Sequence, residues 1–289
     1  MTVEEKYIRV SDGLRIHYRD YPGAGEPSGA PILCLHGLTR NARDFEDLAP
    51  QLAETGRRVI VPSQRGRGPS QWDPQPERYN PVVYAADMLE LLDKLDVGRA
   101  VFIGTSMGGL ITMLAAARAP GRLAGAVLND IGPEVDPAGL ARIRGYVGLG
   151  GAVSTWSEAA QHCRSINGAS FPGAQDDAFW LSFARKTYRT QEAGRIVPDY
   201  DPAIARAFGG AAGVPDLWPL FDALKPIPAL VIRGEISDVL MISTVERMRR
   251  QKPDLGFVSI PGVGHAPFMT EPAAQAALNT FLNGLAGRS

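Results

Sequence analysis

The order of apolar and helical segments along the chain predicts an α/β fold, in which a mostly parallel twisted sheet of about eight strands has helices on both faces. Short apolar runs have the length of buried strands, and segments with helical periodicity fall between them. A Ser-Asp-Gly turn at 11–13 joins two alternating segments, which is typical of a hairpin. This hairpin would give the sheet an antiparallel edge.

The sequence predicts eight strands and, outside the inserted segment, four helices. The expected strands are 7–10 and 14–18 in the hairpin, then 32–35, 59–61, 100–103, 126–128, 230–232 and 257–260. The expected helices are 43–54, 81–95, 107–118 and 271–285, the last with Glu271 and Pro272 in its first turn.

The alternation of strand and helix stops after the strand that ends near Asn129 and resumes near residue 230. We therefore expect a core of residues 1–133 and 214–289 and an inserted helical cap of residues 134–213. The expected cap helices are 138–147, 155–166, 176–188 and 202–208. This segment is rich in aromatic residues, which predicts an apolar pocket roof in addition to packing between cap and core.

Composition limits the kinds of partner that the chain attracts. Thirty basic and 31 acidic residues give a formal charge of −1, so no overall field draws in nucleic acid or an anionic membrane. Apolar runs are too short to span a bilayer, and the first ten residues do not resemble a secretory signal, so we expect a soluble cytoplasmic protein. Cys34 and Cys163 are far apart in sequence, which favours reduced thiols.

A candidate nucleophile lies in the sequence GTSMG at 104–108, between an apolar run and a helical segment. A serine at such a strand-turn-helix junction has a strained backbone and an exposed hydroxyl, and Gly104 and Gly108 leave room for the strand and the helix. The first N–H groups of the helix face any oxyanion that forms beside Ser106. This pattern predicts a nucleophilic serine.

A serine hydroxyl needs a base to remove its proton, and the base needs a carboxylate to hold it. His265 is the expected base, because it follows the last strand in a loop at the carboxyl end of the sheet. Asp238 is the preferred acid, since it follows the strand 230–232 and gives the chain order serine, acid, histidine. Asp130, at the end of an earlier strand, and Glu235 are the competing acids.

The segment that follows strand 32–35 is the expected second half of an oxyanion hole. Backbone N–H groups of Leu38 and Met107 would face the developing oxyanion, with Gly37 allowing close backbone approach. His36 is expected to fix the shape of this loop and not to react. The mechanism predicted from these residues uses no metal and no cofactor.

Together these motifs resemble the α/β-hydrolase superfamily over nearly the whole chain. The family commonly has an acid at the start of the segment that here reads SQRGRGPS at 63–70, so Ser63 departs from its pattern and affects how that loop is braced. The resemblance implies hydrolysis of a small or medium carboxylic ester or lactone through an acyl-enzyme. A serine nucleophile, where some related enzymes place an aspartate, argues against dehalogenase and epoxide hydrolase chemistry.

Two other functions remain open at this point. One is hydrolysis of a carbon–carbon bond in ring-cleavage products, which the same triad would support. The other is a ligand-sensing protein of the same fold with little turnover. The identity of the substrate, the cap residues that line the pocket and the oligomeric state do not follow from the sequence.

Overall fold

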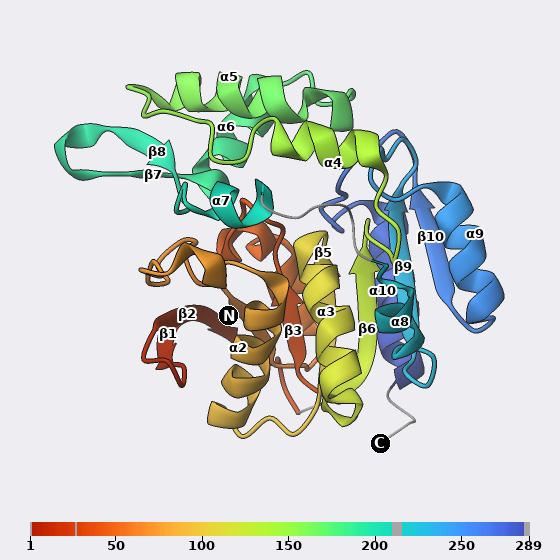
Figure 1. Cartoon of the computed structure of the whole chain (residues 1–289). Coiled ribbons are helices and arrows are strands. Elements are labelled where there is room, and N and C mark those ends of the chain that lie inside the picture. The colour runs from red at the N-terminus through yellow and green to blue at the C-terminus, as the bar shows by residue number, and fades with distance from the viewer. Residues whose placement is uncertain (1, 27, 210–215, 286–289) are drawn as a thin grey trace.

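The computed structural model describes residues 2–26, 28–209 and 216–285, and its centre is an eight-stranded, mostly parallel sheet (Figure 1). The strand order is β1-β2-β4-β3-β5-β6-β9-β10, with β1 and β2 antiparallel to the strands beside them. The predicted fold class is confirmed. The strands are β1 (Glu4–Arg9), β2 (Arg15–Tyr21), β3 (Ile32–Leu35), β4 (Val59–Pro62), β5 (Ala100–Thr105), β6 (Leu123–Asn129), β9 (Ala229–Gly234) and β10 (Gly256–Ile260).

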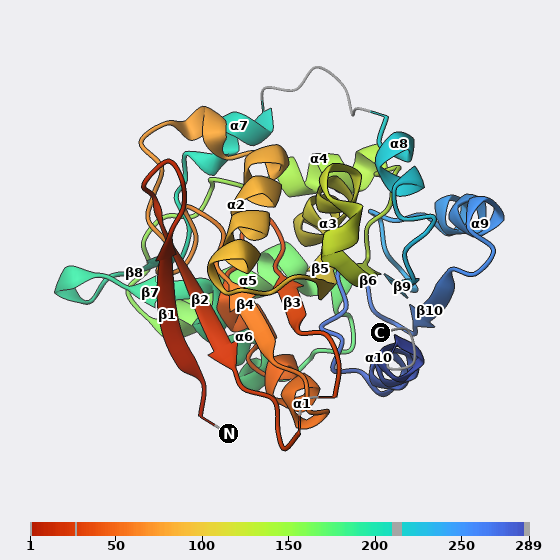
Figure 2. The same cartoon turned by 90° about the horizontal axis from the view of Figure 1, so that it is seen from below.

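Helices cover both faces of this sheet, as the view along the strands shows (Figure 2). The central strands are buried on both sides, because alternate side chains of each strand enter two separate apolar clusters. One cluster lies under α2, α3, α8 and α9, and the other lies under α1 and α10. These helices are α1 (Leu48–Glu54), α2 (Pro81–Lys94), α3 (Met107–Arg118), α8 (Trp218–Asp222), α9 (Ile242–Gln251) and α10 (Pro272–Leu285).

The segment between β6 and β9 forms helices that lie across one end of the sheet (Figure 1). It has an apolar cluster of its own, built around Phe171, Trp180 and Phe183. The division of the chain into a core and a cap of residues 134–213 remains a prediction, and residues 210–213 lie outside the described part. We use the name cap for the elements from residue 137 to residue 209. They are α4 (Pro137–Arg144), α5 (Trp156–Asn167), α6 (Asp177–Thr187), β7 (Tyr188–Thr190), β8 (Ile196–Pro198) and α7 (Ile204–Gly209).

The main differences from the sequence prediction are one interrupted helix and several elements that were not predicted. The expected helix 43–54 is a 3-10 turn, Ala42–Phe45, followed by α1. Pro50 explains the break, because it has no N–H to donate to residue 46 in a continuous helix, whereas in the first turn of α1 none is needed. Helices α8 and α9 and the β7–β8 hairpin were not predicted.

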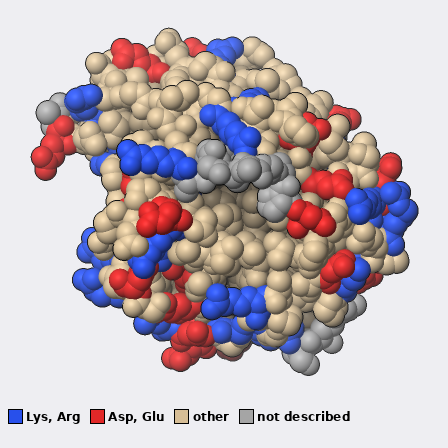
Figure 3. Space-filling view, viewed as in Figure 1, with Lys and Arg blue, Asp and Glu red and all other residues tan. Residues whose placement is uncertain are grey.

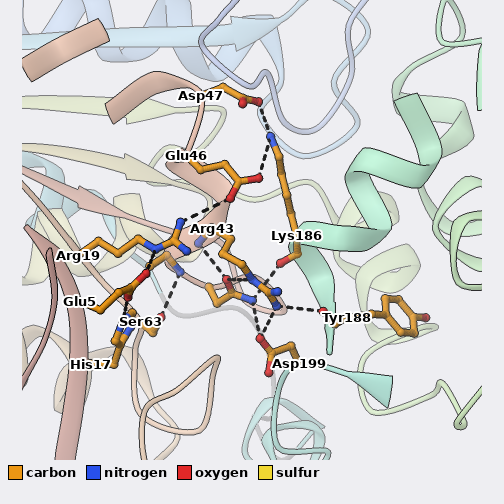
Figure 4. A network of polar contacts seen from close by, with 12 residues as sticks. Glu5, His17, Arg19, Arg43, Glu46, Asp47, Ser63, Lys186, Tyr188 and Asp199 are labelled. Carbon is orange, nitrogen blue, oxygen red and sulfur yellow. Dashed lines mark hydrogen bonds and ion pairs between the residues drawn. The ribbon is translucent and has the colours of Figure 1, made fainter. Parts of the chain in front are cut away.

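A polar cluster centred on Asp199 joins the cap to the core (Figure 4). The buried carboxylate of Asp199 accepts hydrogen bonds from Asn41 Nδ2 at 3.2 Å and Arg43 Nη2 at 2.5 Å, and it pairs with Arg189 Nε at 3.2 Å. Arg43 Nη2 also donates to the carbonyl of Tyr188 at 3.0 Å. The turn at 41–45, which follows the loop after β3, is therefore tied to the cap hairpin.

Charged side chains of both signs are scattered over the face of the molecule in Figure 3, where uncharged residues cover most of the surface. In the described part of the chain, no helix combines the length and the apolar character needed to cross a bilayer.

Candidate active site

Ser106 occupies a sharp turn between β5 and α3. Its φ of 52° and ψ of −114° are strained for a non-glycine residue, and its N–H donates to the carbonyl of Asn129 at 3.0 Å. A Cβ on Gly104 would lie 2.3 Å from the carbonyl oxygen of Gly108, and a Cβ on Gly108 would lie 2.1 Å from that of Leu35. Glycine at both positions therefore lets β5 and α3 come close enough together to form the strained turn at Ser106.

His265 reaches Ser106 from the loop between β10 and α10. Its Nε2 lies 2.9 Å from Ser106 Oγ, and its side chain is 8% exposed. The neighbouring Gly264 donates its N–H to the carbonyl of Ser170 at 2.7 Å, which anchors this loop to the cap. The structure thus brings together the expected nucleophile and the expected base.

The carboxylate that contacts His265 belongs to Asp130, directly after β6. Asp130 Oδ2 lies 2.7 Å from His265 Nδ1, and the carboxylate is fully buried. It also accepts hydrogen bonds from Ser237 Oγ at 2.6 Å and from the Gly234 N–H at 2.8 Å. When Nδ1 carries the proton and donates to Asp130, Nε2 has a free lone pair that faces the hydroxyl of Ser106.

The expectation that Asp238 holds His265 is wrong in this structure. Asp238 instead forms a bidentate pair with Arg142 of α4, with distances of 2.6 and 2.8 Å, and this guanidinium lowers the pKa of the carboxyl group. The cause is the turn after β9, in which the N–H of Ser237 donates to the carbonyl of Gly234 at 3.0 Å. This turn directs residue 237 toward the neighbouring strand β6, while Asp238 faces the cap.

Glu235, the other competing acid, also lies away from His265. Its Oε2 accepts the N–H of Gly262 at 2.8 Å, so it braces the turn after β10.

The loop after β3 places Leu38 beside Ser106, as expected. Leu38 and Met107 both line a cavity that contains Ser106, and the N–H of Met107 belongs to the first turn of α3, which has no acceptors within the helix. A Cβ on Gly37 would lie 3.9 Å from Ser106 Cβ, an ordinary contact distance. Glycine at this position therefore keeps space open beside the nucleophile and relieves no backbone clash.

His36 is fully buried and braces two loops. Its Nε2 accepts the N–H of Gln64 at 3.0 Å, so Nδ1 carries the proton and donates to the carbonyl of Gly37 at 2.7 Å. Burial lowers the pKa of His36 to about 3, so the ring is neutral at ordinary pH. These contacts agree with the structural role expected for it.

Arg67 holds the loop after β3 in place, a role that the sequence did not indicate. It is fully buried and donates through Nε to the carbonyl of Leu38 at 3.0 Å and through Nη1 to Tyr84 Oη at 2.7 Å. By holding the Leu38 carbonyl, it fixes the loop that lines the cavity beside Ser106. Ser237 was also missed, and only its place next to Asp238 in the sequence hinted at it.

Two cavities lie on either side of Ser106, and both are also lined by Leu38 and Ile143. We call the first the Arg40 cavity; it encloses about 650 Å³, counting space open to solvent, and its lining includes Arg40 and His265. We call the second the apolar cavity; it encloses about 670 Å³ and lies between α2, α3 and α4. Cap residues Tyr146, Phe171 and Phe183 line the Arg40 cavity, in agreement with the expected aromatic roof.

A contact chain of serine, histidine and aspartate on a mostly parallel sheet with helices on both faces is typical of an α/β hydrolase. The family model described as "alpha/beta hydrolase fold" matches residues 30–272, and the chain belongs to this family.

Relatives and solved structures extend this likeness over nearly the whole chain. A 3-hydroxybutyrate-oligomer hydrolase of Cupriavidus necator is 34% identical over 96% of this chain and 97% of its own length. A 2-(acetamidomethylene)succinate hydrolase of Mesorhizobium japonicum is 28% identical over 89% of this chain and 88% of its own. The crystal structure of an alpha/beta hydrolase from Novosphingobium aromaticivorans is 47% identical, with a TM-score of 0.90 over 97% of this chain and 98% of that one.

Proposed function

We propose that this protein is a serine hydrolase that cleaves a small or medium carboxylic ester or lactone through an acyl-enzyme, with Ser106, His265 and Asp130 as its triad. The observation that carries the proposal is the unbroken contact chain from Ser106 Oγ to His265 Nε2 and from His265 Nδ1 to Asp130 Oδ2. The relative from Cupriavidus necator is named for hydrolysis of 3-hydroxybutyrate oligomers, which are esters, and this supports an ester as the first substrate to test.

The reaction follows from the positions of these groups. His265 Nε2 takes the proton of Ser106 as Oγ attacks the carbonyl carbon, and the N–H groups of Leu38 and Met107 stabilise the oxyanion. The bond to the alcohol oxygen then breaks, and His265 gives its proton to that oxygen. Water attacks the acyl-enzyme by the same path in reverse, which releases the acid and restores the serine. The buried Asp130 stabilises the imidazolium that forms twice in this cycle.

Substitution of the nucleophile tests the proposal. Ser106→Ala is expected to lower kcat/KM by at least about 10³-fold on 3-hydroxybutyrate oligomers and p-nitrophenyl esters, without loss of the folded structure. A fluorophosphonate probe is expected to label Ser106 in the unmodified protein and leave Ser106→Ala unlabelled, as read by peptide mass.

A matched control is Ser165→Ala, because Ser165 lies on an exposed stretch of α5, where its Oγ donates to the carbonyl of His162. This variant is expected to keep full turnover and labelling. Near-normal hydrolysis by Ser106→Ala would reject the proposed triad.

A further inference from the structure

The two cavities beside Ser106 differ in the charge of their walls. The apolar cavity has no charged side chain in its lining, which is mainly aliphatic and aromatic. The Arg40 cavity contains a guanidinium from Arg40 and a carboxylate from Asp44, together with the amide of Asn167. The two halves of an ester bound across Ser106 therefore meet different surroundings.

The position of His265 decides which half of the ester enters which cavity. The leaving alcohol must receive its proton from His265 Nε2, so its oxygen has to lie on the His265 side of Ser106. His265 lines the Arg40 cavity and is absent from the lining of the apolar cavity. The alcohol half consequently faces Arg40, and the acyl half enters the apolar cavity.

Arg40 retains hydrogen-bonding capacity for a ligand. Its guanidinium carbon lies 4.1 Å from the ring centroid of Phe183 and 5.8 Å from that of Phe268, so two aromatic rings hold it in place. Nε and Nη2 both donate to one oxygen of Asp44, while Nη1 has no hydrogen-bond partner among the residues that the structure describes. The side chain is 16% exposed, and Nη1 is accessible to a ligand in the cavity.

An anion in the Arg40 cavity would satisfy these donors. Charge-assisted hydrogen bonds are strongest where water is excluded, and a guanidinium matches the planar geometry of a carboxylate. Asp44 already lies against Arg40, which disfavours an anion with two charges, such as a phosphate. A singly charged carboxylate is the better match.

We propose, on the basis of the function proposed above, that Arg40 binds a carboxylate on the alcohol half of the substrate. The preferred substrates would then be esters in which a hydroxycarboxylic acid is the leaving alcohol, with an apolar acyl group on the other side. Arg40 takes no part in bond making, because the proton still passes between Ser106, His265 and the alcohol oxygen. It determines which ester is held in place for attack.

Two esters that differ in a single charge test this proposal. One is 3-(butyryloxy)butyrate and the other is its methyl ester, which has the same acyl group and the same hydroxyacid skeleton. We expect the unmodified protein to prefer the charged ester in kcat/KM, and Arg40→Gln to lower the ratio of charged to neutral by roughly tenfold to a hundredfold. Asp44→Asn is expected to raise the ratio, since it removes the carboxylate that competes for the same guanidinium.

The matched control is Arg185→Gln. Arg185 also stacks on an aromatic ring, with its guanidinium carbon 3.9 Å from the Trp156 centroid, but it is exposed on the cap and absent from the lining of the Arg40 cavity. This variant is expected to keep the ratio of the unmodified protein. A ratio that falls as much in Arg185→Gln as in Arg40→Gln would overturn the proposal.

A binding measurement makes the test independent of turnover. We expect calorimetry to show 3-hydroxybutyrate binding to Ser106→Ala, with at least a tenfold loss of affinity when Arg40→Gln is added.

Equal rates on the two esters in the unmodified protein, or an equal loss on both in Arg40→Gln, would overturn the role of Arg40 and leave the hydrolase proposal standing. Turnover of either ester by Ser106→Ala would instead overturn the hydrolase proposal. The two failures are therefore distinguishable.

Discussion

The carboxylate of Asp130 is held from three directions by hydrogen-bond donors. His265 Nδ1, Ser237 Oγ and the Gly234 N–H all lie within 2.8 Å of its oxygens, and the group is fully buried. Three donors on one carboxylate fix its direction relative to His265. Asp238, by contrast, pairs with Arg142 of the cap, and its side chain is 39% exposed.

Amide substitutions at these two acids separate their roles. Asp130→Asn is expected to lower kcat by about 10³- to 10⁴-fold, because an amide neither stabilises the imidazolium nor enforces the tautomer of His265. Asp238→Asn is expected to stay within about threefold of the unmodified rate. Esterase assays on both folded variants measure these two kcat values. A larger loss of kcat in Asp238→Asn than in Asp130→Asn would assign the catalytic role to Asp238.

Single-residue patterns pointed to Ser106 and His265, which the structure brings into contact, but not to Asp130 as the carboxylate beside His265. Ser106 and His265 are marked by local signals, a glycine-flanked turn and a loop after the last strand. The choice between Asp130 and Asp238 depends on the turn after β9, which directs Ser237 toward Asp130 and Asp238 toward Arg142. Contacts between strands far apart in sequence set the direction of this turn. Arg40 carries no local signal at all, because its importance arises from the cavity that surrounds it.

At the scale of elements, two loops near Ser106 are joined to each other. The loop after β3 and the loop after β4 are joined by the His36–Gln64 hydrogen bond and by Arg67, which donates to the carbonyl of Leu38. Ser63 takes part as well, since its Oγ accepts the N–H of Ala42 at 3.1 Å. The loop is thus braced even though the residue usual in the family is replaced.

The neutral state of His36 makes this brace sensitive to acid. Its pKa is about 3 in the folded protein, below the ordinary value of 6.5, so between these limits the unfolded chain binds a proton that the folded chain does not. The contribution of His36 to the free energy of unfolding is fully present above pH 6.5, and it decreases as the pH falls from 6.5 toward 3. Between pH 6.5 and pH 4.5 its share of the loss is about 2 kcal/mol in the free energy of unfolding.

Urea denaturation of the unmodified protein and of His36→Gln at the two pH values measures this share. His36→Gln is expected to be less stable at pH 6.5 but to lose about 2 kcal/mol less on acidification. Parallel losses in the two proteins would show that His36 does not titrate on unfolding.

Prediction of elements succeeded where periodicity is undisturbed. Helices α2 and α3 lie within one residue of their expected ends, since each begins and ends at a clear signal. Helix α9 was missed because its polar sequence buries only Thr244, Val245 and Met248, which gives a weak pattern. The β7–β8 hairpin was missed because its strands have three residues each, too short to show an alternation.

At the scale of the whole molecule, the cap and the core are held together on two sides of the active site. On one side the Asp199 cluster ties the β7–β8 hairpin to the turn at 41–45. On the other side Arg142 pairs with Asp238, and a Cβ on Gly139 would lie only 2.1 Å from the carbonyl oxygen of Asp238. Both attachments reach loops that lie next to Ser106, so the position of the cap bears on the shape of the Arg40 cavity.

Removing the charge of Asp199 is expected to loosen the cap. Asp199→Asn leaves Arg43 and Arg189 without their shared carboxylate, and we expect a loss of about 2 kcal/mol in the free energy of unfolding. Amide exchange should rise over residues 186–199. Asp177→Asn is the control, because the Asp177 side chain is 98% exposed on the same cap; equal exchange in the two variants would contradict the role given to Asp199.

Four of the five groups assigned to the reaction come from the chain before the inserted helices, and only the imidazole of His265 comes after them. The amino-terminal part of the molecule thus carries a nearly complete reaction centre, while the insertion contributes walls. Exchange of that insertion by recombination would change the wall of the substrate pocket and leave the reacting groups in place. Homologues could therefore diverge in substrate specificity without any change in these groups.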